Sequence, residues 1–187
     1  MNQNEQDYQE ELQFVKDFIK HKVLITDYPY HESYRKTLSK EYTHLHGKLL
    51  VIGSGPLPLS MYMVGGFVDG LDCSEEAVDY GKRFLKKAHG VDFSIYCERA
   101  ELFSSYEKYD SILLTLEAGA KEDSKRLILD KLPHNMKQGA TLLVRSSNTE
   151  GDFVNATHLL ESLEGFTLVD KLSVFDGLST SFVLTKV

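Results

Sequence analysis

The stretch VIGSGPLPLS, residues 51–60, combines residue types that can hold a small ligand. Four apolar residues lead into a Gly-Ser-Gly turn, and Pro56 and Pro58 follow it with one leucine between them. Glycines that follow a buried strand let a ligand contact bare backbone. No third glycine follows, and proline removes N–H donors that a phosphate would use. The loop therefore favours an uncharged edge or a sulfonium over a pyrophosphate, with an ordinary tight turn as the alternative.

Two acidic residues follow later strands of the expected sheet. Asp72 comes about twenty residues after the glycines, at the position where an acid accepts hydrogen bonds from ribose hydroxyls. Its alternative role is a favourable interaction with the next helix dipole, although Ser74 can cap that helix without it. Glu101 follows the third strand, where such sheets commonly contact adenine, and its alternative is a solvated loop residue. Together these residues predict an adenosyl ligand without phosphate, namely S-adenosylmethionine.

The elements that must position these residues alternate between strand and helix after a helical start. Gln9–Lys20 carries a stripe of apolar residues typical of an amphipathic helix, and a second helix is expected from about Glu32. Strands are expected over residues 48–54, 66–74, 92–98, 109–119 and 140–147, and helices over 74–88, 124–136 and 153–163. The last two strands, 166–176 and 179–187, are joined at Gly177. They stand too close for a helical crossover, so they must pair as an antiparallel hairpin.

This order of elements predicts the class of fold. Strands alternating with helices indicate an α/β fold with a mostly parallel sheet covered on both faces. A C-terminal antiparallel hairpin on such a sheet is the Rossmann-like architecture of S-adenosylmethionine-dependent methyltransferases, an inference by analogy of fold. We expect one globular unit, with residues 1–46 as a helical lead-in or lid and residues 47–187 as the cofactor-binding domain.

Composition excludes several other classes of function. The chain of 187 residues has a formal charge of −7 and no basic block, which argues against a nucleic-acid partner. No apolar run approaches the ~20 residues that span a membrane, and the polar, acidic N-terminus is unlike a secretory signal. Two cysteines without metal or redox spacing fit a reducing cytoplasm. The seven histidines show no recurring ligand spacing, so we expect no metal site.

Four segments carry a resemblance to a known family. They are YPYHESY (28–34), LLVIGSGPLPLS (49–60), LLVRSSNTEGDFV (142–154) and VFDGLSTSFVLTKV (174–187). In this order they resemble nicotianamine synthase and its bacterial relatives that make opine-type metallophores. That family carries an aromatic-Pro-Tyr-Tyr-x-Asn-Tyr segment, a Gly-x-Gly-Pro-(Leu/Met)-Pro-Leu-(Thr/Ser) cofactor loop, an Arg-Ser strand end and an Asn-Ser-Val-Ile-containing last strand. The resemblance runs from about Glu11 to Val187, and the Pro-Leu-Pro loop is its most specific part.

The resemblance implies an unusual use of the cofactor. S-adenosylmethionine would be a co-substrate whose 3-amino-3-carboxypropyl group moves to a small amine or amino acid, releasing methylthioadenosine. All three carbons on the sulfonium are electrophilic, and the one presented in line at ~3–3.5 Å reacts. The alternatives are a small-molecule methyltransferase, intramolecular cyclisation of the cofactor to azetidine-2-carboxylate, and a silent cofactor-binding subunit. The acceptor, the number of transfers and the oligomeric state stay open, a homodimer included.

The resemblance also implies which residues act on the acceptor amine, which must lose a proton. Tyr30 matches the first of the family's paired tyrosines, and Glu11 matches a family glutamate. His31 stands in place of the second tyrosine. These three are the predicted catalytic residues, with packing as the alternative for Tyr30 and a solvated helix acid for Glu11. Tyr34 and Arg145 are predicted to bind substrate, Arg145 through its planar fork, with packing and a surface ion pair as their alternatives.

The predicted cofactor-binding residues follow the same strand ends. They are Gly53, Ser54, Gly55, Pro56, Leu57, Asp72, Cys73, Ala100, Glu101 and Leu116. Two departures from the family pattern bear on the acceptor. His31 and the following Glu32-Ser33 replace the Tyr-x-Asn of the family, and only about fifty residues precede the cofactor loop, fewer than in the plant enzymes. A shorter lead-in suggests a smaller acceptor or a simpler reaction.

Overall fold

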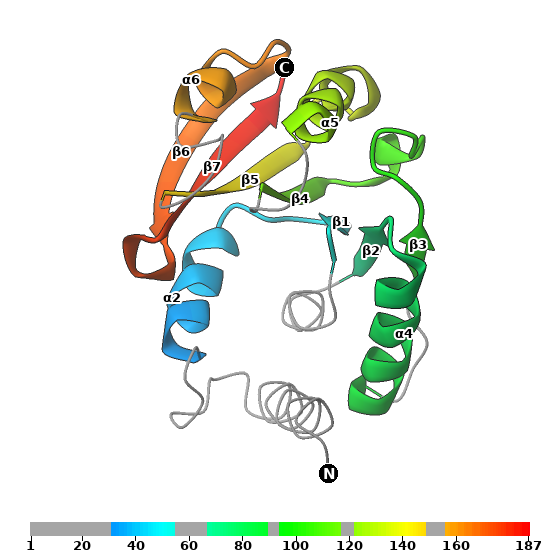
Figure 1. Ribbon diagram of the computed structural model, residues 1–187. Helices are drawn as coiled ribbons and strands as arrows, with labels where there is room; N and C mark the ends of the chain where they lie inside the picture. The colour runs from blue at the N-terminus through cyan, green and yellow to red at the C-terminus, as the bar shows by residue number, and fades with distance from the viewer. Residues whose placement is uncertain (1–30, 55–66, 90–93, 117–121, 149–155) are drawn as a thin grey trace.

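A seven-stranded sheet forms the centre of the molecule (Figure 1). The computed structural model describes residues 31–54, 67–89, 94–116, 122–148 and 156–187. The strand order is β3-β2-β1-β4-β5-β7-β6. The strands are β1 (Leu49–Ile52), β2 (Val68–Asp72), β3 (Ile95–Cys97), β4 (Ser111–Leu116), β5 (Thr141–Ser147), β6 (Phe166–Val174) and β7 (Ser179–Lys186). Strands β1 to β5 pair in parallel, whereas β7 runs antiparallel to both β5 and β6.

Helices cover both faces of this sheet. They are α2 (His31–Glu41), α4 (Glu75–His89), α5 (Glu122–Asn135) and α6 (Ala156–Glu161), with short 3₁₀ turns η1 (Tyr106–Lys108) and η2 (Phe175–Gly177). Figure 1 shows α2 and α4 on one face and α5 and α6 on the other. The central strands are buried on both faces, which explains why LLVI of β1 reads as a continuous apolar run. Leu50, Ile112 and Leu142, from three neighbouring strands, are fully buried in the core.

The predicted class of fold is confirmed. Among the described residues, the parallel strands, the helices that follow β2, β4 and β5, and the C-terminal hairpin β6–η2–β7 are present. The second helix begins at His31, one residue before the expected start. Of the strand expected over 92–98, the described part is extended only over Ile95–Cys97. Strand β6 lies at the opposite edge of the sheet from β3, and its pairing with β7 shifts register between Leu168 and Asp170.

The topology brings several strand ends to one edge. Strands β2 and β3 lie on one side of β1, and β4 and β5 lie on the other. In open α/β sheets, ligands bind beyond the carboxyl ends of the strands at such a reversal of strand order. We call the end of the sheet where strands β1 to β5 finish the carboxyl edge, and the end where they start the amino edge. Ser147, the last residue of β5, pairs with Ser179, the first of β7, so the η2 turn also lies at the carboxyl edge.

Candidate active site at the carboxyl edge

Gly53 and Ser54 continue β1 beyond the carboxyl edge. Gly53 has a φ of +70°, a conformation that favours glycine, and its N–H donates to the carbonyl of Leu71 at 2.9 Å. A side-chain carbon built on Gly53 would meet no atom of the described residues within 4 Å. Ser54 is only 3% exposed, and its hydroxyl has no hydrogen-bond partner among the residues that the structure describes. Gly55, Pro56 and Leu57 lie outside the described residues.

Asp72 ends β2, as predicted, and has one carboxylate oxygen available. Its Oδ1 accepts a hydrogen bond from the N–H of Ser74 at 3.0 Å. Ser74 in turn caps α4, because its Oγ accepts from the N–H of Ala77 at 3.2 Å. Within the described part of the chain, Oδ2 of Asp72 has no partner. Cys73 follows as an exposed free thiol beside the strand end. Asp72 can therefore accept a further hydrogen bond, whereas its capping role is taken by Ser74.

The loop after β3 holds Ala100 and Glu101 in place. The carbonyl of buried Ala100 accepts from the Tyr106 hydroxyl at 2.6 Å. The Glu101 carboxylate accepts from Nε of Arg99 at 2.7 Å, and its pKa lies below the ordinary value because of a hydrogen bond from its own backbone N–H and this arginine. Glu101 is therefore an ionised residue that is paired within its own loop. Its contact with adenine stays a prediction. Leu116 is the last residue of β4.

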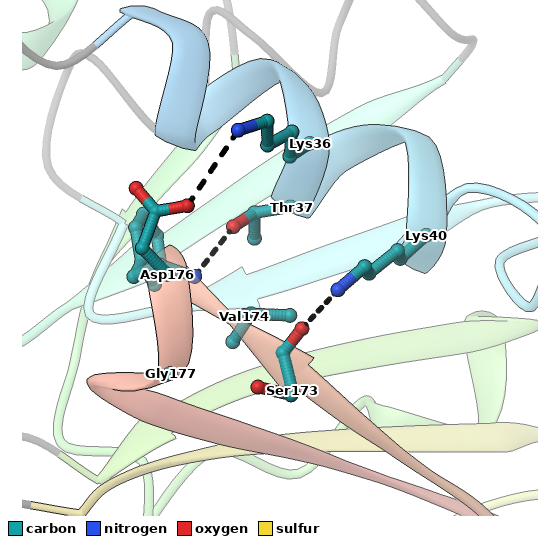
Figure 2. A pocket seen from close by; sticks show the side chains of 8 residues that line it. Lys36, Thr37, Lys40, Ser173, Val174, Asp176 and Gly177 are labelled. Atoms are coloured by element: carbon teal, nitrogen blue, oxygen red, sulfur yellow. Dashed lines mark hydrogen bonds and ion pairs between the residues drawn. The ribbon is translucent and has the colours of Figure 1, made fainter.

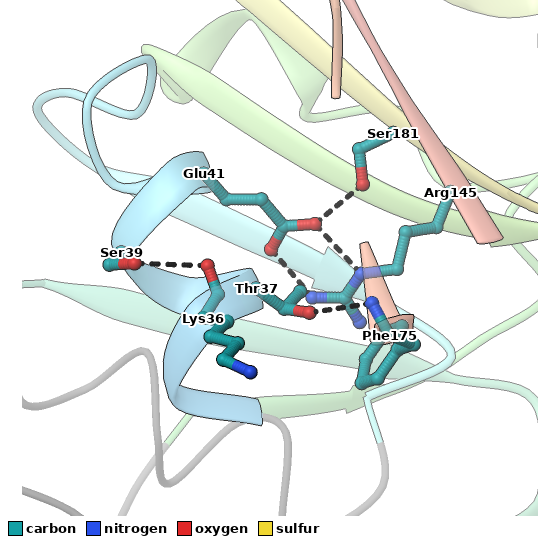
Figure 3. A network of polar contacts seen from close by, with 7 residues as sticks. All are labelled: Lys36, Thr37, Ser39, Glu41, Arg145, Phe175 and Ser181. Carbon is teal, nitrogen blue, oxygen red and sulfur yellow. Dashed lines mark hydrogen bonds and ion pairs between the residues drawn. The ribbon is translucent and has the colours of Figure 1, made fainter. Parts of the chain in front are cut away.

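Arg145 lies in a buried ion pair that sequence analysis did not foresee (Figure 3). Its Nε donates to Oε1 of Glu41 at 2.9 Å, and its Nη2 donates to Oε2 at 2.6 Å. The Ser181 hydroxyl also donates to Glu41 Oε1, at 2.6 Å. Glu41 is fully buried and Arg145 is 6% exposed. The fork predicted to bind a substrate carboxylate is thus occupied by Glu41, and the alternative of a surface ion pair is wrong because the pair is buried.

The same contacts fix α2 to the sheet. The guanidinium of Arg145 lies 5.1 Å from the centre of the Phe175 ring, and the N–H of Phe175 donates to Thr37 Oγ1 at 3.0 Å (Figure 3). In the sequence, Glu41 falls three residues after Leu38, and residues at this spacing lie on one face of a helix; this indicates a charge beside an apolar residue but not its partner. His31 and Tyr34 lie on this helix, whereas Tyr30 and Glu11 lie outside the described residues.

The described residues hold neither a cluster of metal-ligating side chains nor a membrane-spanning helix. No group of three or more His, Cys, Asp or Glu side chains within them is arranged to hold a metal ion. No helix in the same residues is long and apolar enough to cross a membrane.

Solved structures share this fold. A crystal structure of a mutant of MtNAS in complex with S-adenosylmethionine aligns with a TM-score of 0.65 and 17% identity, covering 96% of this chain and 71% of that one. The N-methyltransferase NodS from Bradyrhizobium japonicum WM9 aligns with a TM-score of 0.63 and 15% identity, covering 87% of this chain and 99% of that one. These likenesses confirm the methyltransferase-type fold.

Curated proteins match in sequence. Nicotianamine synthase 1 of Arabidopsis thaliana is 22% identical over 175 residues, which cover 85% of this chain and 55% of that protein. Probable nicotianamine synthase 6 of Hordeum vulgare is 27% identical over 142 residues, covering 66% and 43%. The chain thus spans about half the length of the curated relatives it matches. The profile of the family described as nicotianamine synthase protein matches residues 2–187, so this chain belongs to the nicotianamine synthase family.

Proposed function

We propose that this protein is an S-adenosylmethionine-dependent transferase that moves the 3-amino-3-carboxypropyl group to a small amine or amino acid. Methylthioadenosine is the second product, and the acceptor that carries the aminocarboxypropyl group serves as a metallophore or its precursor. The observation that carries the proposal is family membership over residues 2–187 together with the polar groups at the carboxyl edge. A mutant of MtNAS, which shares the fold, was crystallised with S-adenosylmethionine.

The carboxyl edge fits the adenosyl part of this co-substrate. The Ser54 hydroxyl is buried without a described partner, and buried polar groups in proteins are nearly always hydrogen-bonded. Oδ2 of Asp72, which has no partner among the described residues, is an acceptor at the position suited to a ribose hydroxyl. No atom of the described residues occupies the space where a side chain of residue 53 would stand. Ser54, Asp72 and the loop carrying Ala100 and Glu101 therefore form the proposed cofactor contacts.

The reaction requires a nucleophile in line with one carbon of the sulfonium. The acceptor nitrogen attacks the carbon of the aminocarboxypropyl arm that is bonded to sulfur. The carbon–sulfur bond breaks, and its electron pair stays on sulfur as the thioether of methylthioadenosine. The amine gives up its proton to an acceptor group, for which Tyr30, Glu11 and His31 are the proposed residues. Such a positioned proton acceptor typically contributes ~10²–10⁴-fold in rate.

A second candidate function is methyl transfer. The likeness to NodS, covering 99% of that N-methyltransferase, favours it. The two reactions differ only in which carbon on sulfur faces the acceptor, so one cofactor site serves either. Their cofactor-derived products differ in mass, methylthioadenosine in one case and S-adenosylhomocysteine in the other.

Product analysis tests the proposed function. Purified protein is incubated with S-adenosylmethionine alone and then with single amino acids and amines, and the products are identified by mass spectrometry. We expect methylthioadenosine together with an aminocarboxypropyl adduct of the acceptor. S-adenosylhomocysteine with a methylated acceptor would establish the methyltransferase instead. Azetidine-2-carboxylate formed without any acceptor would establish the intramolecular reaction, and no turnover with any acceptor would contradict all three.

Asp72→Asn tests the cofactor contacts. A lost hydrogen bond to a charged acceptor costs about 1.5–3 kcal/mol, so S-adenosylmethionine should bind about 10- to 100-fold more weakly. Asp79→Asn is the matched control, because Asp79 is an exposed acid further along α4. Calorimetric titration of both variants gives the affinities, and thermal unfolding confirms that each is folded. An unchanged affinity for Asp72→Asn would remove this residue from the site.

A further inference from the structure

A polar pocket lies between α2 and the η2 turn (Figure 2). Its volume is about 170 Å³, below the ~300–1,000 Å³ of sites that hold a whole drug-sized molecule. It is lined by Lys36, Thr37, Lys40, Ser173, Val174, Phe175, Asp176 and Gly177. A pocket of this size suits one functional end of a small molecule.

Its chemistry is that of a carboxylate site. Lys36 and Lys40 stand one helical turn apart on α2, so both ammonium groups belong to the same side of the pocket. Lys40 donates to the carbonyl of Ser173, which uses one of the three N–H donors of an ammonium. Lys36 pairs with Asp176 at 3.8 Å, with both side chains more than half exposed. An ion pair this exposed is weak, so a ligand carboxylate can replace it.

The turn that closes the pocket has a strained backbone. Phe175 and Asp176 have φ values of +48° and +54°, which residues other than glycine rarely adopt, and Gly177 follows at +91°. The Phe175 N–H bond to Thr37 Oγ1 holds the turn against α2. Residues other than glycine that are held in the left-handed region cluster at active sites and ligand clamps.

The position of the pocket indicates which molecule it serves. The proposed cofactor contacts follow β1, β2 and β3, on one side of the reversal in strand order. The η2 turn lies at the same carboxyl edge but beyond β5, on the other side. An acceptor that attacks the sulfonium has to approach from the side that the cofactor leaves open. Helix α2 also carries His31 and Tyr34, in the segment that resembles the family's tyrosine segment.

We propose that this pocket binds a small carboxylate, supplied by the amine acceptor, through the ammonium groups of Lys36 and Lys40. The assignment of this carboxylate to the acceptor rests on the proposed function. Binding of the carboxylate itself does not depend on that function, so it can be measured without S-adenosylmethionine.

The binding test compares two probes that differ in one group. L-alanine and ethylamine are titrated into isotope-labelled protein, and the amide NMR signals of Asp176 and Gly177 are followed. L-alanine should shift these signals to saturation, and ethylamine should leave them in place. In Lys36→Met/Lys40→Met the affinity for L-alanine should fall about tenfold or more, because charge-assisted hydrogen bonds are lost. The separate variant Lys36→Arg/Lys40→Arg, which keeps both positive charges, should still bind L-alanine.

The control variant is Lys82→Met, which removes one positive charge from the exposed surface of α4. It should bind L-alanine like the original protein. The proposed site is overturned if L-alanine produces no saturable shift, if ethylamine produces the same shift, or if the double Met variant keeps its affinity while folded.

A kinetic arm identifies the source of the carboxylate. For amino-acid acceptors, the double Met variant should raise KM with little change in kcat, while its affinity for S-adenosylmethionine stays the same. An unchanged KM together with lost L-alanine binding would overturn the assignment to the acceptor and point to a separate carboxylate ligand. L-alanine binding without any methylthioadenosine release from the original protein would contradict the proposed function but support the pocket.

Discussion

The two edges of the sheet use polar residues in opposite ways. At the amino edge, the Asp69 carboxylate accepts from the Tyr109 hydroxyl at 2.8 Å and pairs with Lys48 at 2.7 Å. Burial raises the pKa of the Tyr109 hydroxyl, and the hydrogen bond with Asp69 raises the pKa of Lys48. The phenol thus stays protonated and can donate to Asp69, and the Lys48 ammonium stays charged and can pair with the same carboxylate.

A second amino-edge cluster is just as well satisfied. Asp110 accepts from the N–H of Lys48 at 2.7 Å and pairs with Lys137, while its own backbone carbonyl accepts from the N–H of Thr141 at 2.9 Å. By contrast, at the carboxyl edge the Ser54 hydroxyl and Oδ2 of Asp72 have no partner among the described residues. The difference teaches that polar residues before the strands hold the fold together, whereas those after β1 and β2 keep hydrogen-bonding capacity that the described residues do not use.

Removing the Glu41–Arg145 pair should have the largest effect on the free energy of unfolding. This pair joins α2 to β5, so it is an exception to the contrast between the two edges. Glu41→Gln leaves a buried guanidinium without its counter-charge, which typically costs about 3–5 kcal/mol. Urea unfolding measures the change in free energy. Glu161→Gln is the control, since its pair with Lys171 is 40% exposed on both sides and should cost below about 1 kcal/mol. A loss below about 1 kcal/mol for Glu41→Gln would contradict a stabilising role.

Gly47 and Gly139 offer a matched comparison at the amino edge. Both have positive φ, +60° and +79°, so alanine at either position should cost about 1–2 kcal/mol from backbone strain. At Gly47 the added carbon would also overlap the Asp110 carboxylate, whereas at Gly139 it would meet nothing within 4 Å. Gly47→Ala should therefore lose about 1 kcal/mol more than Gly139→Ala in urea unfolding. Equal losses would mean that Asp110 yields without cost.

Asp110 should give the smallest effect, visible mainly in acid. The hydrogen bonds from the Lys137 ammonium and the Lys48 N–H hold the pKa of this carboxyl below its ordinary value. Its contribution to stability is therefore present above the ordinary pKa of about 3.9 and is lost as pH falls through the lower folded-state value. Asp110→Asn should flatten the loss of unfolding free energy below about pH 5. Asp130→Asn, at an exposed position on α5, should leave the pH profile unchanged.

Much of the fold could be predicted because it depends on local patterns. Apolar runs, Ser74 before an amphipathic helix and two strands too close for a crossover are all visible within short windows. Asp72 was placed correctly at a strand end for the same reason. The partner of Arg145 could not be found in this way, because Glu41 is 104 residues away and nothing near either residue specifies the other. The strained η2 turn was equally hidden, since Gly177 predicted a turn but not two left-handed residues before it.

The register shift in β6 has a consequence for self-association. An edge strand exposes unpaired backbone groups to which a strand from another copy can pair. Between Leu168 and Asp170 the pairing of β6 with β7 slips, and the exposed Asp170 and Lys171 follow directly. A bulge bends the strand, and the charged side chains of Asp170 and Lys171 make it costly for a strand of another copy to cover this edge. Strand β6 is therefore a poor template for a continuous sheet between copies of the chain.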